Sequence, residues 1–136
     1  QGAHGSTFGG NPLSCAAALK TIELIQNGLM KNAAVQGEYI MKHLRSMQKK
    51  HPRMGDVRGK GLMIGVEFVR DGRKTKAKEE SNQLVLEAFK RGLLLLPCGE
   101  NCVRLSPSLT VTRDQCDVML DVWEESLTAV EQQQKN

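Results

Sequence analysis

Two stretches near the start of the chain repeat apolar residues every three or four positions, which is the spacing of one face of a helix. Asn11 and Pro12 are expected to begin the first helix, because asparagine caps free backbone amides and proline suits the first helical position. Gly28 is expected to end it. A second helix is predicted over residues 30–50, where His51 and Pro52 end it. The apolar positions of the two helices are Cys15, Ala18, Leu19, Ile22 and Ile25, then Ile40, Leu44 and Met47.

From Val57 onward the apolar residues alternate with other residues, and this period of two indicates a strand. Glycine residues just before it indicate a turn or a shorter strand. A short buried strand is predicted over residues 93–96, and another over residues 102–105, which Pro107 closes. The alternating apolar positions of the first strand are Leu62, Ile64, Val66 and Phe68.

Two further helices are predicted from the returning helical spacing. One covers residues 81–91 and ends at Gly92, after a charged loop over residues 71–78. Thr112 caps the last helix, and Gln115 stands where it completes a capping box. Helices and strands in this order predict an α+β fold of two layers, with helices packed on one face of a small, mostly antiparallel sheet. The apolar positions of these helices are Leu84, Val85, Ala88 and Phe89, then Val118, Met119, Val122, Trp123 and Leu127.

Composition places the chain among soluble globular proteins. Its 136 residues suffice for one compact domain, and 40% apolar with 25% charged residues argues against general disorder. The net charge of +4 is spread along the chain, and the densest basic run contains Asp71 and precedes Glu79 and Glu80. A solvated loop is therefore favoured over a nucleic-acid site, which would gather basic residues on one face. The sequence contains no run typical of a membrane span.

The four cysteines indicate a reducing, intracellular compartment, because they form no dense disulfide framework. Cys98 and Cys102 lie close together in the sequence and raise the question of a metal site. Neither histidine nor a second cysteine pair stands nearby at zinc-ligand spacing, so no metal site is predicted. The two residues are interpreted as ordinary thiols beside a strand.

Two segments carry residues that suit a ligand. Ser6 and Thr7 lie in a glycine-rich turn just before a helix start, where hydroxyls and amides could bind a phosphate; the alternative is a plain turn and cap. Arg104 interrupts a strand between apolar neighbours, so alternation places it on the opposite face. There its guanidinium could bind a carboxylate in bidentate fashion, or could simply be solvated. Arg58 and Lys60 are interpreted as surface or interdomain groups.

Three segments together resemble the class III (omega) aminotransferases, the family that includes acetylornithine, ornithine and 4-aminobutyrate aminotransferases. They are HGSTFGGNPLSCAAAL, VRGKGLMIGVEF and GLLLLPCGENCVRLSPSLTVT, and they occur in the family's order over residues 5–127. The resemblance implies the small C-terminal domain of a fold-type-I transferase dependent on pyridoxal phosphate. Residues 1–28 would be the end of the cofactor-domain segment with a linking helix, and residues 29–136 the small domain.

The same resemblance implies roles for three residues. Thr7, with Ser6 beside it, matches the position that binds the cofactor phosphate of the partner subunit in a homodimer. Arg104 matches the arginine that binds the substrate carboxylate. The implied enzyme is cytoplasmic and moves an amino group from an amino acid to a 2-oxo acid such as 2-oxoglutarate, with no nucleic-acid or membrane partner.

No catalytic residue is identified in the chain. The family's Schiff-base lysine and the aspartate that pairs with the ring nitrogen lie upstream, and nothing in this sequence matches them. Lys20, Lys60 and Lys90 are explained by helix surfaces and a turn. The chain is therefore expected to be a fragment that is inactive alone. The alternatives are a non-catalytic assembly or interaction domain, and a basic nucleic-acid-binding module that uses Lys74, Lys76 and Lys78.

Overall fold

The computed structural model describes residues 5–71 and 75–133 of the chain. Within these residues the order of helices and strands agrees with the predicted order. The elements are α1 (Pro12–Leu24), the π-helical turn η1 (Ile25–Leu29), α2 (Met30–Gln48), β1 (Met54–Lys60), β2 (Met63–Phe68), α3 (Lys78–Lys90), β3 (Leu96–Cys98), β4 (Cys102–Leu105) and α4 (Arg113–Gln133).

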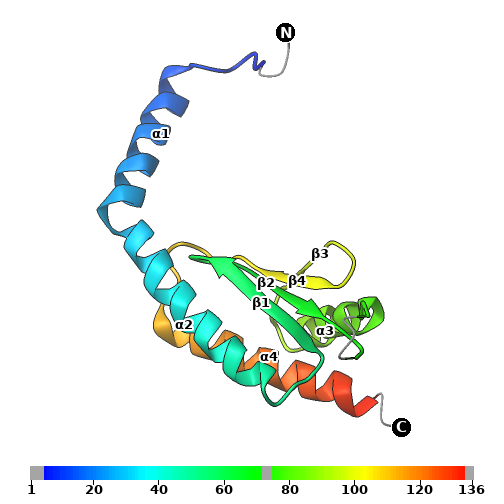
Figure 1. Ribbon diagram of the computed structural model, residues 1–136. Helices are drawn as coiled ribbons and strands as arrows, with labels where there is room; N and C mark the ends of the chain where they lie inside the picture. Colours follow the sequence, from blue (N-terminus) through cyan, green and yellow to red (C-terminus); the bar gives the residue numbers. More distant parts are fainter. Residues whose placement is uncertain (1–4, 72–74, 134–136) are drawn as a thin grey trace.

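The strands form one sheet in the order β1-β2-β4-β3, and every neighbouring pair in it is antiparallel. Helices α2, α3 and α4 lie together on one side of this sheet (Figure 1). The predicted two-layer α+β fold is therefore confirmed. The other face of the sheet is not covered by any described helix, so side chains on that face are open to solvent or to a binding partner.

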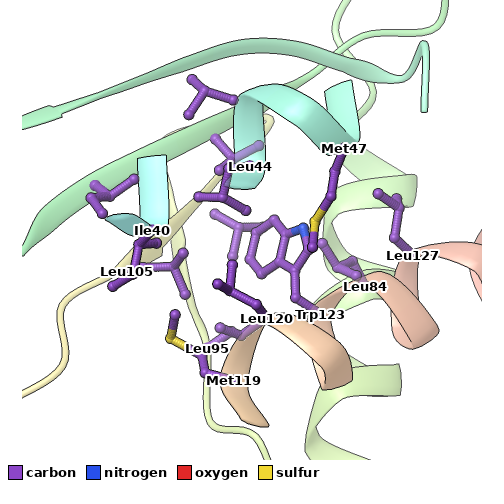
Figure 2. Close-up of a cluster of buried hydrophobic side chains, with 14 of the residues drawn as sticks. Ile40, Leu44, Met47, Leu84, Leu95, Leu105, Met119, Leu120, Trp123 and Leu127 are labelled. Atoms are coloured by element: carbon purple, nitrogen blue, oxygen red, sulfur yellow. The ribbon is translucent and has the colours of Figure 1, made fainter. Parts of the chain in front are cut away.

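Alternate residues of the central strands supply the sheet's part of the core, as the period of two predicts. Ile64, Val66 and Phe68 of β2 are each no more than 1% exposed. Figure 2 shows Trp123 of α4 surrounded by side chains from α2, α3 and α4. Trp123 is itself fully buried. Burial of each large apolar side chain contributes roughly 1.5–3 kcal/mol, so this layer is the main source of stability.

The predicted helix starts at the two ends of the chain are confirmed. The side chain of Asn11 accepts a hydrogen bond from the Ser14 amide at 3.0 Å and so caps α1. At α4 the Thr112 hydroxyl accepts from the Gln115 amide at 3.3 Å, and the Gln115 side chain accepts from the Thr112 amide at 3.0 Å. This reciprocal pair is the expected capping box.

A close backbone contact fixes α2 against the β1–β2 hairpin. Gly37 is buried on α2, and a β-carbon built at this position would lie only 2.8 Å from the α-carbon of Gly61 and closer still to its carbonyl group. Gly61 forms the hairpin turn with a φ of 56°, in the left-handed region that glycine adopts readily. Only glycine at position 37 permits this approach.

Several sequence predictions are wrong in their bounds. Residues 93–96 do not form a buried strand: β3 runs Leu96–Cys98 and is exposed throughout. The segment before the first predicted strand is expected to be a turn or a shorter strand. It is instead β1, which has seven residues and is longer than the six-residue β2. Helix α3 begins at Lys78, three residues before the predicted start at position 81. Of the predicted loop, residues 72–74 lie outside the described residues.

The predicted apolar faces are not all buried. No residue of α1 is buried, and Leu19 and Ile22 are 70% and 51% exposed. Figure 1 shows α1 extending away from the sheet beyond the start of α2. Phe89 and Val118 are also more than half exposed. More than half of each of these apolar side chains is left open to solvent by the described chain.

Candidate functional site

Strand β4 directs Arg104 onto the open face of the sheet. Its neighbours Val103 and Leu105 are 0% and 3% exposed and belong to the core. Arg104 is exposed, on the opposite face. The orientation predicted from alternation is therefore confirmed, whereas a role in binding a substrate stays a prediction.

The surroundings of Arg104 leave its guanidinium accessible. Its cross-strand neighbours are Gly65 of β2, which has no side chain to cover it, and Leu96 of β3. The Arg104 side chain makes no hydrogen bond or ion pair with any residue within 5–71 and 75–133. Arg104 also borders an apolar hollow. The other residues that line this hollow are Leu93, Leu94, Leu96, Leu105, Ser106, Pro107 and Met119.

Arg58 has a different environment on the same face. Its guanidinium donates to Asp56 at 2.7 Å and to Glu67 at 3.1 Å. The hydrogen bond to Asp56 and then the one to Glu67 raise the pKa of Arg58 above its usual value. Two carboxylates therefore already balance the charge of Arg58. Arg104 lacks such partners in the described chain, so its positive charge is available for an added carboxylate.

Ser6 and Thr7 lie at the other end of the described chain, in an exposed turn that leads into α1. The Gly9 amide donates to the Ser6 carbonyl at 3.3 Å and closes this turn. Neither hydroxyl forms a hydrogen bond with another described residue. Free hydroxyls just before a helix start have the chemistry needed to bind a phosphate, since the helix dipole adds positive potential there. The turn therefore fits a phosphorylated cofactor.

One copy of the chain does not bring Thr7 and Arg104 together. Every described residue from position 5 to position 24 is exposed except Asn11, which is half-buried. In Figure 1 the segment before α1 stands well away from β4. If Thr7 binds a phosphate and Arg104 binds a carboxylate, the two residues either belong to different sites or form one site with a second copy of the chain.

The other candidates have ordinary structural explanations. Lys20 binds Glu23 at 2.8 Å and Lys90 binds Glu87 at 2.8 Å, while Lys76 forms an ion pair with Glu100. Lys74 lies outside the described residues. No group of three or more potential metal ligands occurs within the described ranges. None of the helices within residues 5–71 and 75–133 has the length and apolar composition needed to span a bilayer.

Sequence reasoning missed the apolar hollow beside Arg104. The apolar run predicts a buried strand over residues 93–96, whereas Leu94 is 79% exposed before β3 and Leu96 is 50% exposed within it. Gly65 in the middle of β2 was a signal for the uncovered guanidinium of Arg104 rather than for the hollow, because a glycine within a strand has no side chain to cover a neighbour. Its position opposite Arg104 becomes known only from the register.

Comparison with known proteins relates these features to one family. The family model described as "Aminotransferase class-III" matches residues 1–127. The chain is 35% identical over 130 residues to acetylornithine aminotransferase of Caldanaerobacter subterraneus, covering 95% of this chain and 31% of that protein. It is 40% identical over 131 residues to leucine/methionine racemase of Thermococcus litoralis, covering 95% and 30%. The chain thus spans less than a third of the length of these relatives.

A solved structure agrees with the sequence comparison. The PLP-bound amine transaminase from an uncultivated Pseudomonas species superimposes with a TM-score of 0.84 at 34% identity, covering 94% of this chain and 30% of that one. The family model covers nearly the whole sequence, and the structural match extends over almost the same share of the chain. The chain therefore belongs to the class-III aminotransferase family, whose cofactor is pyridoxal phosphate.

Proposed function

We propose that this chain is the C-terminal part of a cytoplasmic, homodimeric aminotransferase. The enzyme would move an amino group from a donor of the acetylornithine, ornithine or 4-aminobutyrate type to a 2-oxo acid such as 2-oxoglutarate. The observation that carries this proposal is Arg104, an exposed guanidinium without an acidic partner in the described chain, next to an apolar hollow. Carboxylates are common to amino acids and 2-oxo acids, so one arginine can serve both substrates.

Arg104 would bind and orient the substrate carboxylate. Its planar guanidinium can donate two parallel hydrogen bonds, which fix the direction of the substrate as well as its position. Leu94 and Leu96 beside it would exclude water when the site is covered, and a dry surrounding strengthens the ion pair. The chain thus supplies substrate recognition rather than the proton-transfer group.

Ser6 and Thr7 would hold the phosphate of the cofactor. When bound, pyridoxal phosphate supplies a ring that accepts the electrons left after the α-proton of the amino acid is removed. Because Thr7 and Arg104 lie apart in one copy, we propose that Thr7 acts in the site of a second copy. In this arrangement residues 1–28 belong with the cofactor domain and residues 29–136 form the small domain. The chain alone would be inactive, since nothing in it matches the Schiff-base lysine.

Substitution of Arg104 in the complete enzyme tests the carboxylate role. Arg104→Ala should raise the KM for 2-oxoglutarate on the order of a hundredfold, because a desolvated charge pair broken on one side costs about 3 kcal/mol. Arg45→Ala, at an exposed arginine of α2, is the matched control and should leave KM unchanged. An unchanged KM in Arg104→Ala would remove Arg104 from the substrate site.

The phosphate role is tested by cofactor retention. Thr7→Ala should weaken cofactor binding by about 1 kcal/mol, the value of one hydrogen bond, which is roughly fivefold in Kd. Thr7→Ser keeps the hydroxyl and should bind as the unsubstituted enzyme does. Equilibrium dialysis against pyridoxal phosphate measures both, and equal retention by all three proteins would count against the role of Thr7.

Amino-acid racemisation is a second candidate, because one relative that is 40% identical is a leucine/methionine racemase. The two reactions differ in their need for an acceptor. An aminotransferase requires a 2-oxo acid for each complete turnover, whereas a racemase inverts the α-carbon without one. Turnover of a single enantiomer in the absence of any 2-oxo acid would favour racemisation. A stable folded dimer with no affinity for the cofactor would instead favour a non-catalytic assembly domain.

A further inference from the structure

The β3–β4 hairpin places two cysteines directly opposite each other. Cys98 ends β3 and Cys102 begins β4, and the two are paired in the antiparallel register. Opposite residues of antiparallel strands have their α-carbons about 4.5 or 5.5 Å apart and point their side chains to the same face. Disulfides accept α-carbon separations of about 4.4–6.8 Å. From this register we infer that Cys98 and Cys102 form a reversible cross-strand disulfide, a site of thiol oxidation independent of the proposed function.

The two thiols differ in their access to an oxidant. Cys98 lies on the exposed edge strand, whereas Cys102 is half-buried between β2 and β3. Burial raises the pKa of the Cys102 thiol above its usual value. Cys98 is therefore the thiol that meets an oxidant first, and Cys102 is the one that resolves the product. On the side of β4 away from β3, Cys102 is paired with Glu67 of β2.

The reaction requires an external oxidant, for which a small disulfide such as oxidised glutathione suffices. The Cys98 thiolate attacks one sulfur of glutathione disulfide, forms a mixed disulfide and releases one glutathione thiolate. The Cys102 thiolate then attacks the Cys98 sulfur and displaces the second glutathione. Both cysteine protons pass to water or to the released thiolates. The two electrons of the cysteine pair thus reduce one glutathione disulfide to two glutathione molecules.

Of the two strands of this hairpin, β3 is the one that can move to form the disulfide. Asn101 is anchored to β2, since its backbone carbonyl accepts from the Phe68 amide at 2.7 Å and its side chain donates to the Phe68 carbonyl at 2.6 Å. Cys102 is therefore held in place. A disulfide brings β-carbons to about 3.5–4.5 Å, slightly closer than the about 4.5–5.5 Å of a cross-strand pair. The Cys102 sulfur lies against β2, 3.2 Å from where a β-carbon on Gly65 would stand, so this side chain must rotate toward β3. The exposed strand β3 must supply the remaining small movement, which makes the bond strained and easily reduced.

Peptide mapping tests this inference. The chain is incubated with oxidised glutathione, alkylated with iodoacetamide, and cleaved without reduction by trypsin and by a protease that cuts after glutamate. Trypsin leaves both cysteines in peptide 92–104, and cleavage after Glu100 separates them. The expected result is that peptides 92–100 and 101–104 remain joined until dithiothreitol is added, with both cysteines losing alkylation together. Full alkylation of both cysteines would overturn the inference.

Single substitutions provide the matched controls. In Cys102→Ser the glutathione adduct at Cys98 should accumulate, because no second thiol removes it. In the unsubstituted chain the adduct should not accumulate, because Cys102 displaces the glutathione. Cys15 is exposed on α1, far from the hairpin in sequence, and reports the behaviour of an isolated thiol. A stable glutathione adduct at Cys98 of the unsubstituted chain, matching the adduct at Cys15, would show that Cys102 does not resolve it and would contradict the proposal.

Discussion

Gly37→Ala is expected to destabilise the chain, although alanine favours helices more than glycine does. The added methyl group would enter the backbone of Gly61, whose α-carbon lies 2.8 Å from the position of the new β-carbon. Backbone cannot rotate out of the way as a side chain can. Overpacking of this kind costs up to about 3 kcal/mol. The gain in helix propensity is roughly 1 kcal/mol, so about 2 kcal/mol of net destabilisation remains.

Urea unfolding followed by tryptophan fluorescence measures this change. Trp123 is the only tryptophan of the chain and is fully buried, so its emission reports the loss of the core. Glu38→Ala is the matched control, because Glu38 is the next residue of α2 and is exposed. Its stability should stay within about 0.5 kcal/mol of the unsubstituted chain.

An unfolding midpoint for Gly37→Ala at or above that of the unsubstituted chain would refute this reasoning. Helix propensity would then outweigh the clash, which requires that α2 and the Gly61 turn do not approach each other as closely as the structure indicates. The control separates this case from a general effect of alanine on α2, because Glu38→Ala also places an alanine in this helix but at an exposed position, where no new atom enters the hairpin.

Two smaller effects are also expected. Thr112→Ala should cost about 1 kcal/mol in the same titration, because it removes the side-chain oxygen that caps α4 through Gln115. Hydrogen bonds from Lys90 and then Arg91 lower the pKa of Glu87 from 4.5 to about 2, so its stabilising contribution is complete above about pH 4.5 and is lost as the pH falls through about 2. Glu87→Gln should therefore flatten the fall of the urea midpoint with decreasing pH across that window.

Features that depend only on nearby residues of the chain, such as helix caps and strand alternation, could be predicted from the sequence. The Asn11 cap depends on Ser14, and the Thr112 capping box depends on Gln115, so both could be predicted from spacing. The alternation that exposes Arg104 is also local. Such features depend on the backbone geometry of a single helix or strand, which the order of residues determines.

The bounds of β3 and the exposure of α1 were not predicted, because both depend on contacts between residues far apart in the sequence. Residues 93–96 are four consecutive leucines, and a short apolar run does not show which of its members pair as a strand. Pairing with β4 places the strand at Leu96–Cys98 and leaves only Leu95 of the four buried. The apolar face of α1 is a similar case: its spacing predicts burial, but burial requires a surface to pack against.

The contrast between Arg58 and Arg104 shows why the candidate site could not be recognised from spacing alone. Both arginines lie on strands and face the same side of the sheet, and both have Gly65 as a cross-strand neighbour. Their charges nevertheless have different environments, because Arg58 lies within reach of Asp56 and Glu67. The nearest strand neighbours of Arg104 carry no acidic group. Asp56 lies only two residues before Arg58 on the same strand, whereas Glu67 reaches Arg58 through the pairing of β1 with β2. Register therefore adds the second carboxylate at Arg58 and places none opposite Arg104.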